Sequence, residues 1–255
     1  MTQQFRQGFP MVEKHQPQQN HLLAGLPVEV LNRLIPGLEL VALPFGKVLY
    51  ESGDILQYVY FPIDSIVSLL YRMEDGSSAE VSVVGNEGFL GIALFMGGES
   101  TSSQAVVQSA GYAYRLQGQQ FKEEFHRHGE LQVLLLRYTQ ALITQMTQTA
   151  VCNRHHSIDQ QLCRWLLLCL DRLPGNRLTM TQELMANMLG VRREGITEAA
   201  GKLQKQGAIE YGRGQITVLD RPTLEKLCCE CYAVVKKETD RLMPRSTRYI
   251  ELSPS

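Results

Sequence analysis

The chain has 255 residues, of which 44% are apolar and 20% are charged, a composition typical of a globular protein. Its apolar stretches fall well short of the ~18 residues that a membrane-spanning helix needs, and its N-terminus lacks the apolar segment of a signal peptide. We therefore expect a cytoplasmic protein without membrane partners. There the six irregularly spaced cysteines stay reduced and form no disulfide framework.

The charge of the chain is unevenly distributed, although its net value is only −1. Residues 1–120 contain 6 Lys and Arg against 11 Asp and Glu, which gives −5, whereas residues 121–255 contain 19 against 15, which gives +4. This asymmetry indicates two parts with different partners, the basic part lying towards the C-terminus.

The first half of the chain is predicted to be a strand-rich domain. Residues 1–25, which begin Gln-rich and polar, are expected to form a flexible tail, followed by a short helix over Leu26 to Ile35. Seven strand-length apolar runs then alternate with turns rich in Gly, Asp and Pro. The runs are "LELVAL", "KVLY", "YVYF", "SIVSLLYRM", "SAEVSVV", "QAVVQS" and "YAYRL". Since no helix separates them, they predict an antiparallel β-roll within residues 26–129 of an α+β protein.

Residues 130–153 are predicted to form one long helix, because neither Gly nor Pro interrupts the sequence from Glu130 to Cys152. Two apolar stripes run along it. The members of the first are Leu131, Leu135, Tyr138 and Leu142, and those of the second are Leu136, Ile143 and Ala150. We expect one stripe to lie on the roll and the other on the same helix of a second subunit. The alternative is a core helix within one subunit.

Residues 154–220 are predicted to form a winged helix-turn-helix. A short helix capped by Ser157 precedes "MTQELMANMLGVRREGITEAAGKLQKQGAIEY". In that segment Thr181 can cap the first helix, and Gly190 falls where the turn needs positive φ. The second helix begins near Arg192 or Arg193, and "IEYGRGQITV" has the pattern of a small β-wing. The remainder, residues 221–255, is predicted to be a helix from Pro222 to Met243 and a disordered tail.

The second of these helices is predicted to read double-stranded DNA. Arg193, Glu194 and Thr197 share the face that is free to enter the major groove. Arg193 can donate two hydrogen bonds to guanine, and Glu194 can accept one from cytosine. The residues expected at DNA phosphates are Thr181, Gln182, Arg192 and, at the wing tip, Arg213. The alternative is that Arg193 and Glu194 form an ordinary solvated pair.

From Leu26 to Leu219 the chain resembles the Crp/Fnr superfamily of bacterial transcription regulators. The order of roll, long helix, short helix and winged helix-turn-helix matches, and "ESGD" and "NEGFLGIALF" are similar to the glycine turns of the family's sensor roll. The resemblance implies a cyclic-nucleotide-binding-like domain and a homodimer that binds a two-fold symmetric operator. It also implies that Arg193 and Glu194 are the reading residues, and RNA polymerase is a further candidate partner.

Three departures from the family pattern limit what the resemblance implies. Arg192 replaces the serine that usually caps the reading helix, and Glu198 replaces a second reading arginine, so the preferred operator is left open. Residues 73–114 contain no Lys or Arg for a cyclic phosphate, and Phe89 replaces the ribose-binding glutamate. Cyclic AMP is therefore not the expected effector. The candidate effector pocket consists of Glu87, Gly88, Phe89, Leu90, Gly91, Ser102, Ser103 and Gln104.

Neither a cofactor nor a metal site is expected. The thiols of "CCEC" at 228–231 fall on the predicted last helix, where only Cys228 and Cys231 share a face, and no second pair of ligands is evident. The pair His155 and His156 is interpreted as a polar helix entry. Buried reduced cysteines are the expected outcome, and the role of Cys229 and its neighbours is left open.

The sequence offers no nucleophile motif, P-loop or metal-ligand set, so an enzyme is not expected. The leading hypothesis is a DNA-binding transcription regulator. The alternative is a signalling module that binds a small molecule or nucleotide and whose C-terminal region mediates protein contacts.

Overall fold

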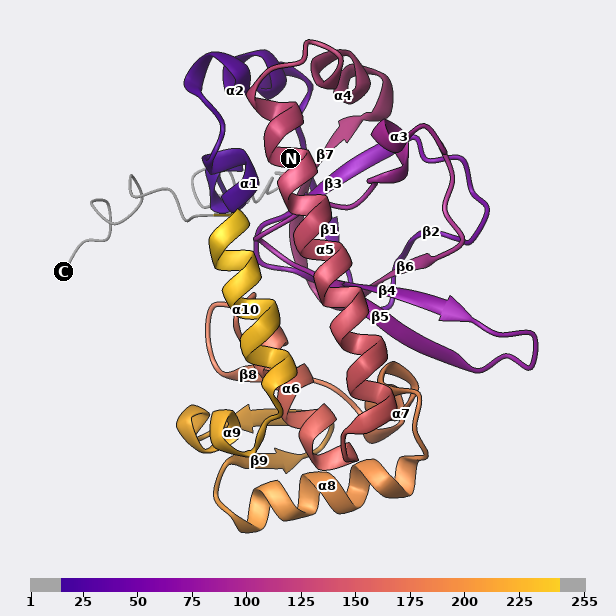
Figure 1. Cartoon of the computed structure of the whole chain (residues 1–255), viewed down its shortest axis with the longest axis vertical. Coiled ribbons are helices and arrows are strands. Elements are labelled where there is room, and N and C mark those ends of the chain that lie inside the picture. Colours follow the sequence, from indigo (N-terminus) through magenta and orange to yellow (C-terminus); the bar gives the residue numbers. More distant parts are fainter. Residues whose placement is uncertain (1–14, 244–255) are drawn as a thin grey trace, which may run out of the picture.

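The computed structural model describes residues 15–243 and consists of a β-roll, a long helix and a smaller helical domain (Figure 1). Helix α5 (Glu130–His155) runs the length of the roll and ends at the helical domain. Within the described residues no helix combines the length and the apolar character required to span a membrane. The first part of the predicted N-terminal tail and the predicted C-terminal tail lie outside the described residues.

The roll contains the seven predicted strands, arranged as two antiparallel sheets. The order in the first sheet is β1 (Glu39–Leu43), β7 (Gly111–Gln117) and β3 (Tyr58–Pro62). The order in the second is β2 (Val48–Tyr50), β6 (Gln104–Ser109), β4 (Ile66–Arg72) and β5 (Ser78–Val84). The short helices of the roll are α2 (Val28–Leu34), α3 (Ala93–Met96) and α4 (Gly118–Phe125). The predicted α+β fold class is confirmed.

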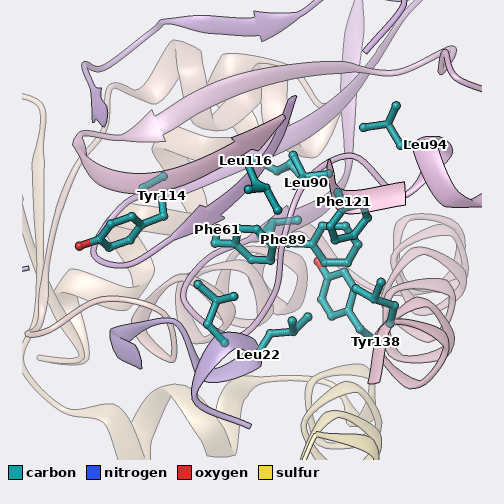
Figure 2. Close-up of a cluster of buried hydrophobic side chains, with 14 of the residues drawn as sticks. Leu22, Phe61, Phe89, Leu90, Leu94, Tyr114, Leu116, Phe121 and Tyr138 are labelled. Atoms are coloured by element: carbon teal, nitrogen blue, oxygen red, sulfur yellow. The ribbon is translucent and has the colours of Figure 1, made fainter. Parts of the chain in front are cut away.

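Aromatic side chains fill the interior of the roll (Figure 2). The ring of Phe89 lies 5.7 Å from that of Phe61, 5.4 Å from that of Phe121 and 5.1 Å from that of Tyr138 on α5. Phe89 is 1% exposed. Because burial of one such ring stabilises a fold by about 1.5–3 kcal/mol, this cluster holds α5 firmly against the roll.

The predicted flexible tail is too long, because residues 15–25 are folded. They include helix α1 (His21–Ala24), and Leu22 and Leu23 are both fully buried in the core of the roll. The preceding residues are polar, and two adjacent leucines are too few to give a periodic pattern. The sequence therefore does not predict that this segment is buried.

Asn20 holds this segment in place. Its side-chain oxygen accepts hydrogen bonds from the backbone N–H groups of Leu22 and Leu23, which caps α1. Its side-chain amide donates to the carbonyl oxygens of Pro62 at 2.9 Å and Gly88 at 2.7 Å. A buried amide thus finds partners for both its donors and its acceptor, as burial requires.

The two stripes of α5 have different environments. Leu131, Leu135, Tyr138 and Leu142 are buried against the roll, which confirms the first part of the prediction. The second stripe faces outwards, with Leu136 54% exposed and Ile143 55% exposed. Helix α10 (Glu230–Leu242) packs along α5 on another side.

The helical domain has the predicted winged helix-turn-helix architecture. Its helices are α6 (Ile158–Leu170), α7 (Gln182–Leu189), α8 (Arg193–Lys205) and α9 (Arg221–Leu227). Its small antiparallel sheet has the order β8 (Arg177–Thr179), β10 (Gln215–Val218) and β9 (Ile209–Gly212), of which the sequence predicted only the two wing strands. Ser157 caps α6 through a reciprocal pair of hydrogen bonds with Gln160, as its position predicted.

The predicted single helix from Pro222 to Met243 is wrong. The chain forms α9 and α10 instead, and Cys228 and Cys229 between them have extended backbone with ψ of 157° and 166°. Pro222 stands at the start of α9, where its missing N–H costs nothing, and Asp220 caps that helix. The break redirects the cysteine side chains away from the helical arrangement that the sequence predicted.

Candidate nucleic-acid interface

The turn between α7 and α8 is built as the sequence predicted. The hydroxyl of Thr181 accepts a hydrogen bond from the N–H of Leu184 at 3.2 Å and caps α7. Gly190 ends that helix in the left-handed conformation, with φ 63° and ψ 35°. Because a side chain at this φ is strained, glycine allows the sharp change of direction that brings α8 across α7.

Helix α8 packs closely on the domain through small and apolar residues. Ile196, Ala199 and Leu203 are buried on its inner face. Gly195 lies against α6 so tightly that an added Cβ would come within 2.6 Å of Ile158 Cδ1. The inner face fixes the orientation of the helix, and the opposite face is left to solvent.

The predicted reading residues lie on that outer face. Arg193, Glu194 and Thr197 are all exposed. Thr197 Oγ1 donates to Gln182 Oε1 at 2.9 Å, so the start of α7 and the second turn of α8 form one continuous polar surface. The side chains of Arg193 and Glu194 make no hydrogen bond or ion pair with any other described residue, and their groups are therefore available to a ligand.

The far half of the same helix is different. Lys202 bridges Asp159 at 3.1 Å and Glu198 at 3.0 Å, and these contacts neutralise its charge locally. Lys205 in the last turn is exposed and also lacks an ion-pair partner among residues 15–243, whereas the unpaired Arg193 and Glu194 lie at the N-terminal end of α8. This is the end at which a helix presents free N–H groups and a positive dipole to an anion.

Arg192 and Arg213 add two more cations to this surface. Arg192 is the N-cap residue of α8, and its side chain accepts no hydrogen bond from the helix, which leaves the first backbone N–H groups uncapped. Arg213 lies at the tip of the wing between β9 and β10 in the left-handed conformation, with φ 52°. Both side chains are exposed and lack ion-pair partners among residues 15–243.

Two domain families match the chain. Residues 160–227 match the Crp-like helix-turn-helix domain, and residues 40–128 match the cyclic nucleotide-binding domain. The chain belongs to the Crp/Fnr superfamily. It is a transcription regulator with a cyclic-nucleotide-binding-like roll and a DNA-binding helix-turn-helix, and not an enzyme.

Solved structures of Crp/Fnr regulators share this fold. The c-di-GMP-responsive global regulator CLP of Xanthomonas campestris is 15% identical with a TM-score of 0.61, covering 76% of this chain and 100% of its own. A Crp/Fnr regulator from Eubacterium rectale is 17% identical with a TM-score of 0.61, covering 82% and 98%. FixK2 from Bradyrhizobium japonicum is 15% identical with a TM-score of 0.60, covering 75% and 98%. No curated protein sequence matches the chain.

The residues predicted to line an effector pocket do not face a common space in this Crp/Fnr roll. Some are buried in its core, and the others contact different neighbours. Phe89 and Leu90 are each 1% exposed and belong to the core, where Gly88 also lies, packed against Tyr138. Gly91 has φ 111° and touches Val59. Core side chains occupy the space around these four residues, so they do not line an open pocket.

The polar members of the predicted pocket already have protein partners. Ser102 contacts the hydroxyl of Tyr71 at 3.0 Å, and Ser103 contacts that of Thr101 at 3.0 Å. Gln104 donates to Glu51 at 2.7 Å. The structure therefore does not assemble these eight residues into a single binding site.

Glu87 instead joins a polar network that the sequence did not predict. The buried guanidinium of Arg172 donates to Glu87 at 2.7 Å, to the carbonyl oxygen of Leu168 at 2.6 Å and to Gln145 at 3.3 Å. The network links the roll, α5 and the end of α6. Its members come from segments up to 85 residues apart, so no local sequence pattern predicts that they meet.

Proposed function

We propose that the protein is a homodimeric transcription regulator that reads a two-fold symmetric DNA site with α8. The observation that carries this proposal is the unpaired, exposed pair Arg193 and Glu194 in the first turn of α8. A folded protein gains little by leaving a guanidinium and a carboxylate beside each other without partners, whereas a DNA major groove offers hydrogen-bonding groups to both.

In the proposed complex the contacts divide by chemistry. Arg193 donates to O6 and N7 of guanine, and Glu194 accepts from N4 of cytosine. Phosphate oxygens are bound by Arg192, by the uncapped N–H groups at the start of α8 and by Arg213 on the wing. Thr181, Gln182 and Thr197 line the same surface and complete the set of phosphate and groove contacts.

A second copy of the chain is the proposed partner of the outer stripe of α5. Leu136, Ile143 and Ala150 recur at spacing seven, which is the repeat that pairs two helices along a common seam. The exposed fractions of Leu136 and Ile143 exceed one half, and Val133 beside them is 42% exposed. A two-fold axis along α5 presents two copies of α8 to two half-sites, as dimeric helix-turn-helix regulators require.

The proposed regulator works without cyclic AMP as its effector. A cyclic phosphate in the roll needs a cation, and the strands and turns from residue 73 to residue 114 contain none. The candidate hydroxyl and amide groups are already bonded to Tyr71, Thr101 and Glu51. The free energy lost by burying a phosphate there exceeds what hydrogen bonds from these groups could recover.

The test is DNA binding by the full chain and by Arg193→Ala. The operator is first selected from random duplexes, and affinities are then measured at several salt concentrations. Loss of the bidentate guanine contact is expected to weaken binding by about 1–3 kcal/mol and to relax preference at one base pair. Lys47→Ala, which removes one exposed cation from the roll, is the matched control and should leave affinity unchanged. Equal affinity of the Arg193→Ala variant and the native chain would refute the assignment.

A further inference from the structure

Four metal-ligating side chains meet where α5 ends and α10 begins. Cys152 and His156 come from the last turn and the C-cap of α5, and Cys229 and Cys231 come from the N-cap and the first turn of α10. One ligand atom of each lies within 4.8 Å of those of the other three. The three cysteines are buried, so the cluster is largely shielded from water.

Two of the separations within the cluster are close to those of a tetrahedral site. With the usual zinc–ligand bonds, two thiolates on one ion lie about 3.8 Å apart, and a thiolate and an imidazole nitrogen lie about 3.6 Å apart. The Sγ atoms of Cys152 and Cys229 are separated by 3.5 Å. The Sγ atom of Cys231 and Nδ1 of His156 are separated by 3.6 Å. Only a small adjustment of these side chains is needed to surround an ion.

The imidazole of His156 is oriented as in metal sites. Its Nδ1 faces Cys231, and its Nε2 lies 3.4 Å from a carboxylate oxygen of Glu230. A carboxylate on the second ring nitrogen fixes the tautomer that leaves the first nitrogen free to bind a metal. The sequence predicted a polar helix entry at this histidine, and it lies between the end of α5 and Ser157, the N-cap of α6.

A buried positive charge, that of Arg164, lies close enough to the cluster to act on the thiol of Cys152. Arg164 of α6 is 3% exposed, donates to the hydroxyl of Thr149 at 3.0 Å, and leaves its Nε without a partner. Within residues 15–243 no carboxylate forms an ion pair with it, and the acid on which its charge acts, Glu80, is itself buried. A buried guanidinium needs a counter-charge, and three thiolates on a divalent ion carry a net charge of −1.

We propose that Cys152, His156, Cys229 and Cys231 bind one thiophilic divalent cation, Zn²⁺, as a closed structural site. Four protein ligands leave no position for a reacting water, which separates structural from catalytic zinc. Binding requires thiolates, so up to three protons pass to solvent when the ion enters. All four ligand atoms lie within 4.8 Å of one another, a spacing that suits one ion and is too short for ligands placed around a cluster of iron and sulfide.

The ion would join two turns of the chain that, besides packing, are linked by the contact of His156 with Glu230 at 3.4 Å. Ser157, which caps α6, directly follows the ligand His156. Helix α6 in turn carries Ile158, on which Gly195 of the reading helix rests. The site therefore fixes the α5–α6 junction against the α9–α10 break, and it sets the position of the DNA-reading domain relative to the long helix.

The test is the metal content of the full chain purified under reducing conditions. We expect about one zinc ion per chain in the native protein, and loss of most of it in Cys229→Ser and Cys231→Ser. Cys228→Ser is the matched control, since this thiol adjoins the site but is not one of the four ligands, and it should keep its zinc. A chelator should lower the Tm of the native protein and of Cys228→Ser.

Cobalt binding keeps the proposal testable if the ligand variants do not fold. Native protein stripped of metal and titrated with Co²⁺ should show thiolate-to-cobalt charge transfer and the intense visible bands of a tetrahedral ion. Metal-free native protein with a weak, octahedral cobalt spectrum would overturn the proposal. So would zinc retained equally in Cys229→Ser and Cys228→Ser. A Cys152–Cys229 disulfide trapped by alkylation in intact cells would also overturn it.

Discussion

Glu80 of β5 should make the stability of the protein fall as the pH rises. Its carboxyl is 7% exposed and accepts a hydrogen bond from Trp165 Nε1 at 2.9 Å, across the junction between the roll and α6. Burial raises the pKa of Glu80 from 4.5 to about 7, and this rise is opposed by hydrogen bonds from Ser68 and Trp165 and by the charges of Arg164 and Arg172. Desolvation of the carboxylate is the dominant effect.

The sign of the effect follows from proton binding. In the unfolded chain Glu80 ionises near pH 4.5, whereas in the folded protein it keeps its proton up to about pH 7. Between these values the folded state binds more protons, so the free energy of unfolding decreases as the pH rises. The contribution is complete below about pH 4.5 and is lost as the pH passes through about 7. At about 1.4 kcal/mol for each pH unit, the loss is about 3 kcal/mol.

The assay compares urea unfolding of the native protein and Glu80→Gln at about pH 5 and pH 8. The amide can still accept from Trp165 but does not titrate. We expect similar stability at the lower pH and a variant more stable by about 3 kcal/mol at the higher pH. Other titrating groups cancel in this difference, and Glu74→Gln, in the exposed turn between β4 and β5, serves as the control. A gap between native protein and Glu80→Gln that does not change with pH would refute the reasoning.

Three further substitutions test other parts of the structure. Ile143→Glu places a charge on the outer stripe of α5 and should convert dimer to monomer in sedimentation, whereas the same change at Ile55, which is 67% exposed on the roll, should not. Asn20→Ala removes the cap of α1 and leaves the carbonyl oxygens of Pro62 and Gly88 unpaired, so thermal unfolding should report a loss of about 2–4 kcal/mol; a loss below about 1 kcal/mol contradicts this role. Gly190→Val forces a β-branched residue to positive φ and should cost about 1–3 kcal/mol, together with DNA affinity, while Gly201→Ala on the open surface of α8 should cost neither.

The sequence predicts the fold where the signal is local. Turn residues separate the seven strand runs, Ser157 and Thr181 mark helix starts, and Gly190 marks the turn of the helix-turn-helix. Each of these depends on backbone conformation within a few residues, which side-chain type controls directly. The same is true of the exposed first turn of α8, where Arg193 and Glu194 are found as expected.

The sequence-based predictions fail where segments that are far apart in the chain come into contact. Leu22 and Leu23 are buried in the core of the roll, and Asn20 anchors their segment to the carbonyl groups of Pro62 and Gly88, more than 40 residues away. The last helix breaks at Cys229, whose sulfur lies 3.5 Å from that of Cys152, 77 residues earlier. A continuous helix would place Cys229 and Cys231 on different faces, and only the tertiary fold brings both of them close to Cys152.

The roll and α8 are connected by a short series of contacts that does not involve the outer stripe of α5. Ile66, Leu70 and Val83 of the roll lie in the same hydrophobic cluster as Trp165 of α6, so the two domains share one core. Glu80 of β5 accepts a hydrogen bond from Trp165 of α6. Helix α6 also contacts α8, where Ile158 packs against Gly195. A displacement of β5 must move α6 or break this packing, because a close-packed core yields by discrete rearrangement rather than by smooth compression. A change in the roll can therefore reach α8, the helix proposed to read DNA, through β5 and α6 within one chain.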